Sequence, residues 1–211
     1  FGNYRNPEAP WRFKTSFPPR SSVDPLSFPT FRGRAAIQPN TVRIGTTQSS
    51  FSGENMETTL IILKPDAVQR GLMGRIISRF EDKGLQVVGG KFMKISDELA
   101  ATHYVDHKER PFYPGLVGFM TSSPVLVLAL RGNGAIAICR SMMGATFGFK
   151  ADPGTIRGDF GVSSSFNLIH GSDSPEAASR ELGLFFNDGE VLDWSRPGDA
   201  WVYDMSSGTP E

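Results

Sequence analysis

The residue best placed for chemistry is His170, in the run Asn-Leu-Ile-His-Gly-Ser-Asp-Ser-Pro that covers residues 167–175. An apolar run precedes this histidine and a glycine turn follows it, which predicts a ring at the end of a strand, beside a helix N-terminus. A neutral imidazole is a good nucleophile near pH 7. The small and polar neighbours favour an accessible, oriented ring over the alternative, an ordinary core histidine.

Two other histidines have a spacing that permits a metal site. His103 and His107 are four residues apart, so a helix would carry both rings on one face. No third ligand is evident, because the single cysteine, Cys139, stands alone. We therefore predict that His103 and His107 are ordinary surface histidines.

Two glycine-rich stretches look like nucleotide-binding loops but lack the required context. Residues 132–137 match G-x-G-x-x-A after a strand, yet residues 144–148 cannot form the parallel strand that a dinucleotide site needs. Residues 84–91 look like a P-loop, but the lysine comes one position late and Phe92 replaces the Ser/Thr. Neither stretch is predicted to be such a site.

Several longer motifs, all in the same order, resemble those of the nucleoside diphosphate kinase family. The run around His170 is similar to the family signature N-x-x-H-G-S-D. The other similar segments are Lys-Pro-Asp-Ala-Val-Gln-Arg-Gly at 64–71, His-Tyr at 103–104, Arg-Pro-Phe-Tyr-Pro-Gly-Leu at 110–116, Pro-Gly-Thr-Ile-Arg-Gly-Asp-Phe at 153–160 and Trp-Val-Tyr-Asp at 201–204. The resemblance runs from Met56 to about Asp204.

The resemblance implies transfer of the γ-phosphoryl group of a nucleoside triphosphate, with ATP as the main donor, to a nucleoside diphosphate. The route would be ping-pong through a phosphohistidine, and it would maintain NTP and dNTP pools. By resemblance His170 is the nucleophile, Glu181 orients its ring and Ser172 supports that glutamate. Phosphoryl transfer also needs cations around the transferring group.

Lys64, Arg140 and Arg157 match the three cations that contact phosphate in the family. The remaining matches are with polar or stacking groups of the nucleotide site: Tyr104, Thr146, Asn167 at the ribose hydroxyl and Phe112 at the base. Mg²⁺ is expected as cofactor, held mainly by the nucleotide phosphates and water, with Asp173 able to act through water. No protein residue is expected to bind the ion directly.

The chain departs from the family pattern in two loops. Residues 145–150 replace a Glu-Thr-Asn-Pro stretch that often takes part in subunit contacts, and a homo-oligomer, tetramer or hexamer, is expected. Residues 163–166 replace a Gly-Arg pair, and Ser164 stands in place of an apolar residue beside the base. The rival reading, a non-catalytic family member, is disfavoured because the nucleophile, its glutamate and all three cations are present.

The elements that must position these residues alternate along the chain. Residues 60–63 form a continuous apolar run, typical of a strand buried on both faces. Apolar residues at 72, 73, 76, 77 and 80 predict a helix that ends at Gly84, and Ser96 and Ser174 are expected to cap two further helices. Further strands are expected within 85–95, at 124–130 and at 166–169. The order βαββαβ predicts an α+β fold, a ferredoxin-like antiparallel sheet with helices on one face.

The first 55 residues differ from the rest, which we assign to one kinase domain at 56–211. They hold seven prolines, seven Lys/Arg and three Asp/Glu, and no apolar periodicity. We predict a disordered Pro/Arg/Ser-rich extension, which is upstream sequence before a natural start at Met56, an organellar transit peptide or a partner-binding tail. The chain's 22 basic and 22 acidic residues give no net charge, so neither nucleic acid nor a membrane is an expected partner. A cytoplasmic location is predicted, with an organelle as the alternative.

Overall fold

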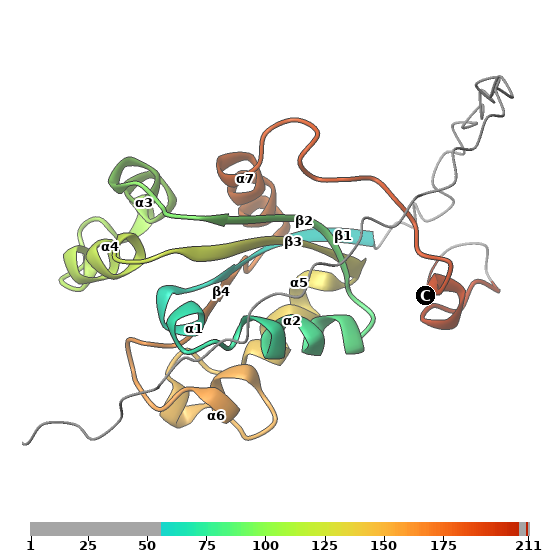
Figure 1. Ribbon diagram of the computed structural model, residues 1–211, viewed down its shortest axis with the longest axis horizontal. Coiled ribbons are helices and arrows are strands. Elements are labelled where there is room, and N and C mark those ends of the chain that lie inside the picture. Colours follow the sequence, from blue (N-terminus) through green and yellow to red (C-terminus); the bar gives the residue numbers. More distant parts are fainter. Residues whose placement is uncertain (1–55, 207–209, 211) are drawn as a thin grey trace, which may run out of the picture. The chain divides into compact units, whose positions relative to one another are not determined.

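The computed structural model describes residues 56–206 and residue 210, so the predictions for residues 1–55 lie outside the described part. Four strands form one antiparallel sheet in the order β2-β3-β1-β4 (Figure 1). Their bounds are β1 Met56–Leu63, β2 Gln86–Met93, β3 Val125–Asn133 and β4 Ile169–Gly171. This order confirms the ferredoxin-like α+β prediction.

Seven α-helices of the described residues surround the sheet. They are α1 Pro65–Gln69, α2 Met73–Asp82, α3 Asp97–His103, α4 Tyr113–Thr121, α5 Ala135–Met143, α6 Ile156–Phe160 and α7 Pro175–Phe185. Three-residue 3-10 helices occur at Val105–His107, Gly148–Lys150 and Asp199–Trp201. None of the helices in this part of the chain has the length and apolar character needed to cross a bilayer.

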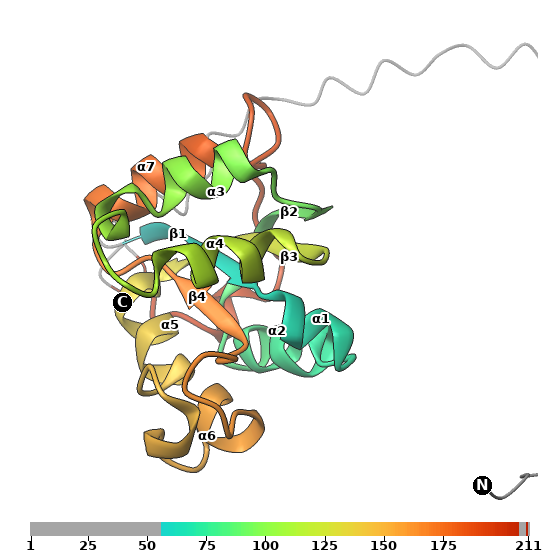
Figure 2. The same ribbon diagram turned by 90° about the vertical axis from the view of Figure 1, so that its left-hand side faces the viewer.

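Helices cover both faces of the sheet, so the expectation of one covered face is wrong. Apolar side chains of α3, α4 and α7 form one core with Leu60 and Ile62 of β1. Those of α1, α2, α5 and α6 form a second core with Ile61 and Leu63. Figure 2 shows α3 and α7 on one side of the sheet and α1, α2 and α5 on the other. Because side chains alternate along a strand, a run of four fully buried aliphatics requires a cover on each side.

The predicted helix boundaries depend on local chemistry and most of them are confirmed. Gly84 follows α2 with a φ of 97°, a conformation that glycine adopts without strain. The Ser96 and Ser174 hydroxyls accept hydrogen bonds from the first turns of α3 and α7. However, α3 ends at His103, so His103 and His107 do not share a helix as their spacing suggested.

The last strand differs from the prediction in position. It covers Ile169–Gly171 instead of residues 166–169, because Leu168 has a left-handed φ of 69° that interrupts extended backbone. The Asp66 carboxylate accepts a hydrogen bond from Leu168 N at 3.0 Å and so holds this conformation. The interruption places His170 inside the short strand, where it pairs with Ile62 of β1.

Candidate active site

The residues predicted from the sequence meet in one cleft of about 1010 Å³. All the predicted catalytic and nucleotide-binding residues except Ser172 line this cleft. Asp173, predicted to act on Mg²⁺ through water, lines it too. Among the catalytic and nucleotide-binding residues that line it, four lie in α5, α6, β4 and α7, and the other five lie in the segments between elements: Arg140, Arg157, His170 and Glu181, then Lys64, Tyr104, Phe112, Thr146 and Asn167. Because these residues are far apart in sequence, only the fold brings them together.

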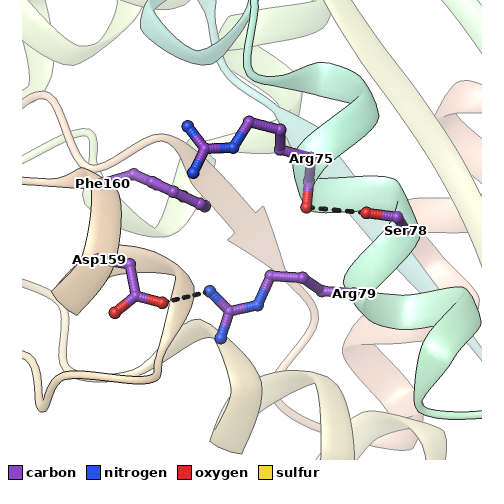
Figure 3. Close-up of a pocket in the computed structure, with 5 residues that line it drawn as sticks. All are labelled: Arg75, Ser78, Arg79, Asp159 and Phe160. Carbon is purple, nitrogen blue, oxygen red and sulfur yellow. Dashed lines mark hydrogen bonds and ion pairs between the residues drawn. The ribbon is translucent and has the colours of Figure 1, made fainter.

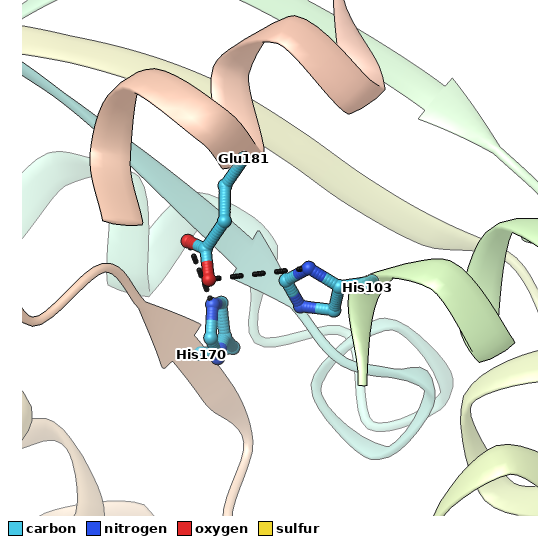
Figure 4. Close-up of side chains that lie close together, drawn as sticks. All are labelled: His103, His170 and Glu181. Atoms are coloured by element: carbon cyan, nitrogen blue, oxygen red, sulfur yellow. Dashed lines mark hydrogen bonds and ion pairs between the residues drawn. The ribbon is translucent and has the colours of Figure 1, made fainter. Parts of the chain in front are cut away.

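His170 forms one end of a short hydrogen-bonded chain of side chains. Its Nε2 lies 3.1 Å from Glu181 Oε2 (Figure 4). The Ser172 hydroxyl donates to the same oxygen at 2.6 Å. Burial opposes ionisation of Glu181, but the hydrogen bonds from His170 and Ser172 outweigh it and lower the pKa of this carboxyl. An ionised carboxylate only accepts, so His170 Nε2 carries the proton and Nδ1 keeps its lone pair.

Backbone contacts fix the segment that carries His170. The buried Arg157 guanidinium donates to the carbonyls of Asn167, Gly144 and Ile169 at 3.1, 3.0 and 2.7 Å. Together with the hydrogen bond that Leu168 N donates to Asp66, these contacts hold Leu168 in its left-handed conformation. Strained backbone that is over-determined in this way is common where a side chain must be positioned for chemistry.

Three positively charged side chains line the cleft, those of Lys64, Arg140 and Arg157. Lys64 Nζ donates to Asn167 Oδ1 at 2.7 Å, and Arg140 Nη1 donates to Gly171 O at 3.4 Å. Burial, with a smaller contribution from Arg157, lowers the pKa of Lys64 to about 8, and burial and Arg140 lower the pKa of Arg157 to about 10. Within residues 56–206 none of the three cations forms an ion pair, so their charge is available to an anionic ligand.

The polar and aromatic residues line the rest of the cleft. The Asn167 amide bridges Lys64 and the Thr146 carbonyl, to which its Nδ2 donates at 2.9 Å. Tyr104 Oη is buried with no hydrogen-bond partner in the described residues, and burial raises its pKa, so it stays a neutral phenol. Phe112, at the cleft rim, is 56% exposed, which leaves its ring free to stack on a flat ligand.

Comparisons with known proteins agree with this geometry. The sequence profile described as nucleoside diphosphate kinase matches residues 57–191. The chain belongs to this family. It is 54% identical to a nucleoside diphosphate kinase of Carboxydothermus hydrogenoformans over 149 residues, which are 71% of this chain and 100% of that protein.

Solved structures of nucleoside diphosphate kinases have the same fold. The halophilic enzyme of Halobacterium salinarum, in complex with CDP, has a TM-score of 0.69 and 52% identity, and the match covers 70% of this chain and 99% of that one. A family protein of Babesia bovis has a TM-score of 0.68 and 43% identity, with the same coverage.

Sequence reasoning missed several residues of this nucleoside diphosphate kinase cleft. His103 is buried and not at the surface, so that prediction is wrong. It ends α3 facing inward, and its ring centroid lies 4.7 Å from that of His170. Burial, and then the neighbouring His170, lower the pKa of His103 to about 3, so its ring is neutral. One feature of the sequence indicated that His103 belongs to the cleft, namely its place next to Tyr104 in the His-Tyr segment that resembles the family.

Three further residues also went without a predicted role. Asp66, in the Lys-Pro-Asp run, holds Leu168. Phe119 and Phe166 line the cleft and pack on each other with ring centroids 4.9 Å apart. Phe166 adds an aromatic surface to the cleft, in the same segment as Ser164. Neither spacing nor periodicity in the sequence identifies these contacts.

A second, smaller pocket of about 480 Å³ lies between α2 and α6 (Figure 3). Arg79 Nη1 lies 2.6 Å from Asp159 Oδ2, and the same side chain donates to the Gly154 carbonyl. The Arg75 guanidinium lies 4.5 Å from the centre of the Phe160 ring. These contacts fasten α6, which carries Arg157, to α2.

Proposed function

We propose that His170 is the residue that carries the phosphoryl group in this nucleoside diphosphate kinase. The reaction transfers the γ-phosphoryl group of a nucleoside triphosphate to a nucleoside diphosphate in two steps. The observation that supports the assignment is the bond from His170 Nε2 to Glu181, because it leaves the Nδ1 lone pair free in the cleft that Lys64, Arg140 and Arg157 also line.

In the first step the Nδ1 lone pair would attack the γ-phosphorus. The bond from that phosphorus to the β–γ bridging oxygen breaks, and the diphosphate leaves with the bonding electrons. Glu181 would hold the proton at Nε2 and stabilise the positive ring, with Ser172 fixing the carboxylate. In the second step an oxygen of another diphosphate would attack the same phosphorus, and the bond from phosphorus to nitrogen breaks.

The other site residues are proposed to position the nucleotide. Lys64, Arg140 and Arg157 would stabilise charge on the transferring group, which is the main need of phosphoryl transfer. Tyr104 and Thr146 would contact phosphate, Asn167 the ribose, and Phe112 the base. Stacking accepts any base, since every base has a π face, and broad nucleotide use is therefore expected.

Mg²⁺ is proposed as the cofactor that arrives with the nucleotide phosphates. The acidic residues of the cleft fit this arrangement: Glu181 is bonded to His170 and Ser172, Asp106 pairs with Arg180, and Asp173 is exposed. These residues offer no carboxylate cage, so the ion would be held by phosphate oxygens and water, with Asp173 acting through water. When bound, Mg²⁺ supplies charge neutralisation of the phosphates.

We further propose a homo-oligomer, with tetramer and hexamer as the two candidate states. Phe147 and Phe149 are 43% and 62% exposed on the loop where family members often contact one another. Light scattering after size exclusion decides between the states. The cytoplasmic location remains a prediction, and the transit-peptide alternative concerns residues outside the described part.

The ping-pong route is testable in two half-reactions. Enzyme phosphorylated with labelled ATP and freed of nucleotide should pass the label to added GDP or CDP. Initial rates with both substrates varied should give parallel double-reciprocal lines. Intersecting lines, together with a label that does not reach the second nucleotide, would contradict the phosphohistidine route.

The lowered pKa of Lys64 predicts a limit on activity at alkaline pH. The pKa falls from 10.5 to about 8, so the free enzyme loses this positive charge as the pH rises through about 8. Since kcat/KM reports the free enzyme, it should decline with an apparent pKa near 8. The Lys64→Arg variant keeps its charge, so its decline should move to higher pH. An unchanged kcat/KM up to about pH 10 would contradict the assignment.

We also propose that residues 56–211 form the domain that carries the activity. The family match begins at residue 57, next to the first residue of β1. A chain that begins at Met56 should have the same kcat and a free energy of unfolding within about 0.5 kcal/mol of the full chain. A melting temperature lower by more than about 5 °C, or a changed oligomer, would show that residues 1–55 contribute to the structure.

A further inference from the structure

Two side chains of metal-ligating type lie next to the proposed nucleophile, His170 of β4. They are His103 of α3 and Glu181 of α7. One donor atom of each of these three residues lies within 4.8 Å of the other two. Figure 4 shows both rings next to the same carboxylate. Glu181 Oε2 lies 3.1 Å from His170 Nε2, and Glu181 Oε1 lies 3.9 Å from His103 Nδ1.

His103 is the member of this cluster that phosphoryl transfer leaves unexplained. Its side chain is only 1% exposed, and neither ring nitrogen has a hydrogen-bond partner within residues 56–206. Buried polar groups are nearly always hydrogen-bonded, and the exceptions often mark a place where a water or an ion binds. The distance of 3.9 Å to Glu181 is too long for a hydrogen bond. The two ring nitrogens of His103, buried without a partner among the described residues, therefore point to a ligand.

We propose that His103, His170 and Glu181 bind a divalent transition-metal ion of the Zn²⁺ type, and that the bound ion inhibits the enzyme. Two imidazole nitrogens and one carboxylate oxygen are the protein ligands of many open, four-coordinate zinc sites. Bonds of about 2.0–2.2 Å place tetrahedral ligand atoms roughly 3.4 Å apart. His170 Nε2 lies 3.1 Å from Glu181 Oε2 and His103 Nδ1 lies 3.9 Å from Glu181 Oε1, so each imidazole is near that separation from one of the two carboxylate oxygens. Mg²⁺ prefers oxygen ligands and is not expected here.

Inhibition follows from the atoms that the ion takes, and this part of the inference rests on the proposed role of His170. A neutral ring that binds the ion through Nε2 carries its proton at Nδ1, so the proton that Nε2 shares with Glu181 moves to Nδ1 by way of the solvent, and the lone pair that would attack phosphorus is lost. The ring then donates electron density to a cation and loses its orienting carboxylate. A cation-bound ring is a weaker nucleophile, so attack on phosphorus slows.

Binding is tested on the full chain without nucleotide. Zn²⁺ alone, titrated in competition with a chromogenic chelator, should bind at one ion per chain. His103→Gln should weaken this binding at least tenfold, whereas the matched His107→Gln variant should bind as the wild type does, because His107 is outside the cluster. Equal affinity of both variants, or no stoichiometric binding, would overturn the proposal. Melting curves establish that each variant is folded.

A measurement on the wild type covers the case in which His103→Gln does not fold. The chain has three histidines, so their ring ¹⁵N resonances can be assigned. Zn²⁺ should shift the ring nitrogens of His103 and His170 and leave those of His107 in place. A shift confined to His107 would also overturn the site.

Inhibition is tested by labelling with ATP in excess Mg²⁺ at a buffered free Zn²⁺ concentration. Saturating Zn²⁺ should slow labelling of the wild type at least tenfold, EDTA should restore it, and His103→Gln should resist. Equal inhibition of both proteins would place the metal on the nucleotide and refute the inhibitory site. Absence of labelling without zinc contradicts the proposed function alone, whereas normal labelling with no zinc binding contradicts only the metal site.

Discussion

His170→Ala is expected to lower kcat/KM at least about a thousandfold, because deletion of a nucleophile removes the covalent route and leaves only binding and positioning. The fold should survive, since the side chain is 23% exposed at the cleft and not part of either core. Steady-state rates and melting curves of the variant measure both effects.

The matched control is His107→Ala, which removes a second imidazole from the same cleft without breaking a bond to Glu181. Its activity should stay within about tenfold of the wild type, a change of about 1.4 kcal/mol in the activation barrier. If His170→Ala retains more than about a tenth of the activity, the assignment of the nucleophile is wrong.

Lys64→Ala should slow phosphoryl transfer to His170 by about 10²–10³, the usual cost of removing one charge-stabilising group from a reacting centre. Its charge acts on the group in transfer, so the effect belongs to the chemical step more than to nucleoside binding. Single-turnover measurements at saturating ATP isolate that step. A change in Kd with an unchanged chemical step would contradict this placement.

Arg157→Ala provides an instructive comparison with Lys64→Ala. It should slow the chemical step similarly, but it also removes one donor from each of three carbonyls, of which Asn167 O keeps its bond from Ile169 N. Unsatisfied buried carbonyls cost about 1–3 kcal/mol each, so this variant should melt at a clearly lower temperature. A rate loss without any loss of stability would show that the three backbone bonds are dispensable.

The parts of the fold that depend on local chemistry were predictable from the sequence. The aliphatic run at 60–63 identified the central strand, and the serine hydroxyls at 96 and 174 identified two helix starts, because each signal acts within a few residues. The strand order followed from the alternation of elements. The same aliphatic run also implied cover on both faces, which the one-face expectation overlooked.

What could not be predicted depends on contacts between distant segments. Leu168 is held in its left-handed conformation by the Asp66 carboxylate, 102 positions away in the sequence. A local sequence pattern therefore cannot predict the shift of the last strand. His103 looked like half of an exposed pair because its spacing to His107 is helical. Its burial results from packing of its ring against Tyr104, His170 and Phe185.

The site residues were predicted from motif resemblance, whereas the fold was predicted from local sequence patterns. Motif resemblance selected residues that the fold brings together in one cleft. Neither periodicity nor composition would have separated Lys64 or Arg157 from an ordinary surface cation. The contacts within the cleft supply the physical reason for each proposed role.

The most direct measurement is the chemical stability of the phosphorylated protein. After incubation with γ-labelled ATP and removal of nucleotide, the protein should carry one label per chain, lost in acid and kept in base, as phosphohistidine requires. The label should be absent from His170→Ala and present in His107→Ala. A label that survives acid, or one that His170→Ala still carries, would contradict the claim that His170 transfers the phosphoryl group.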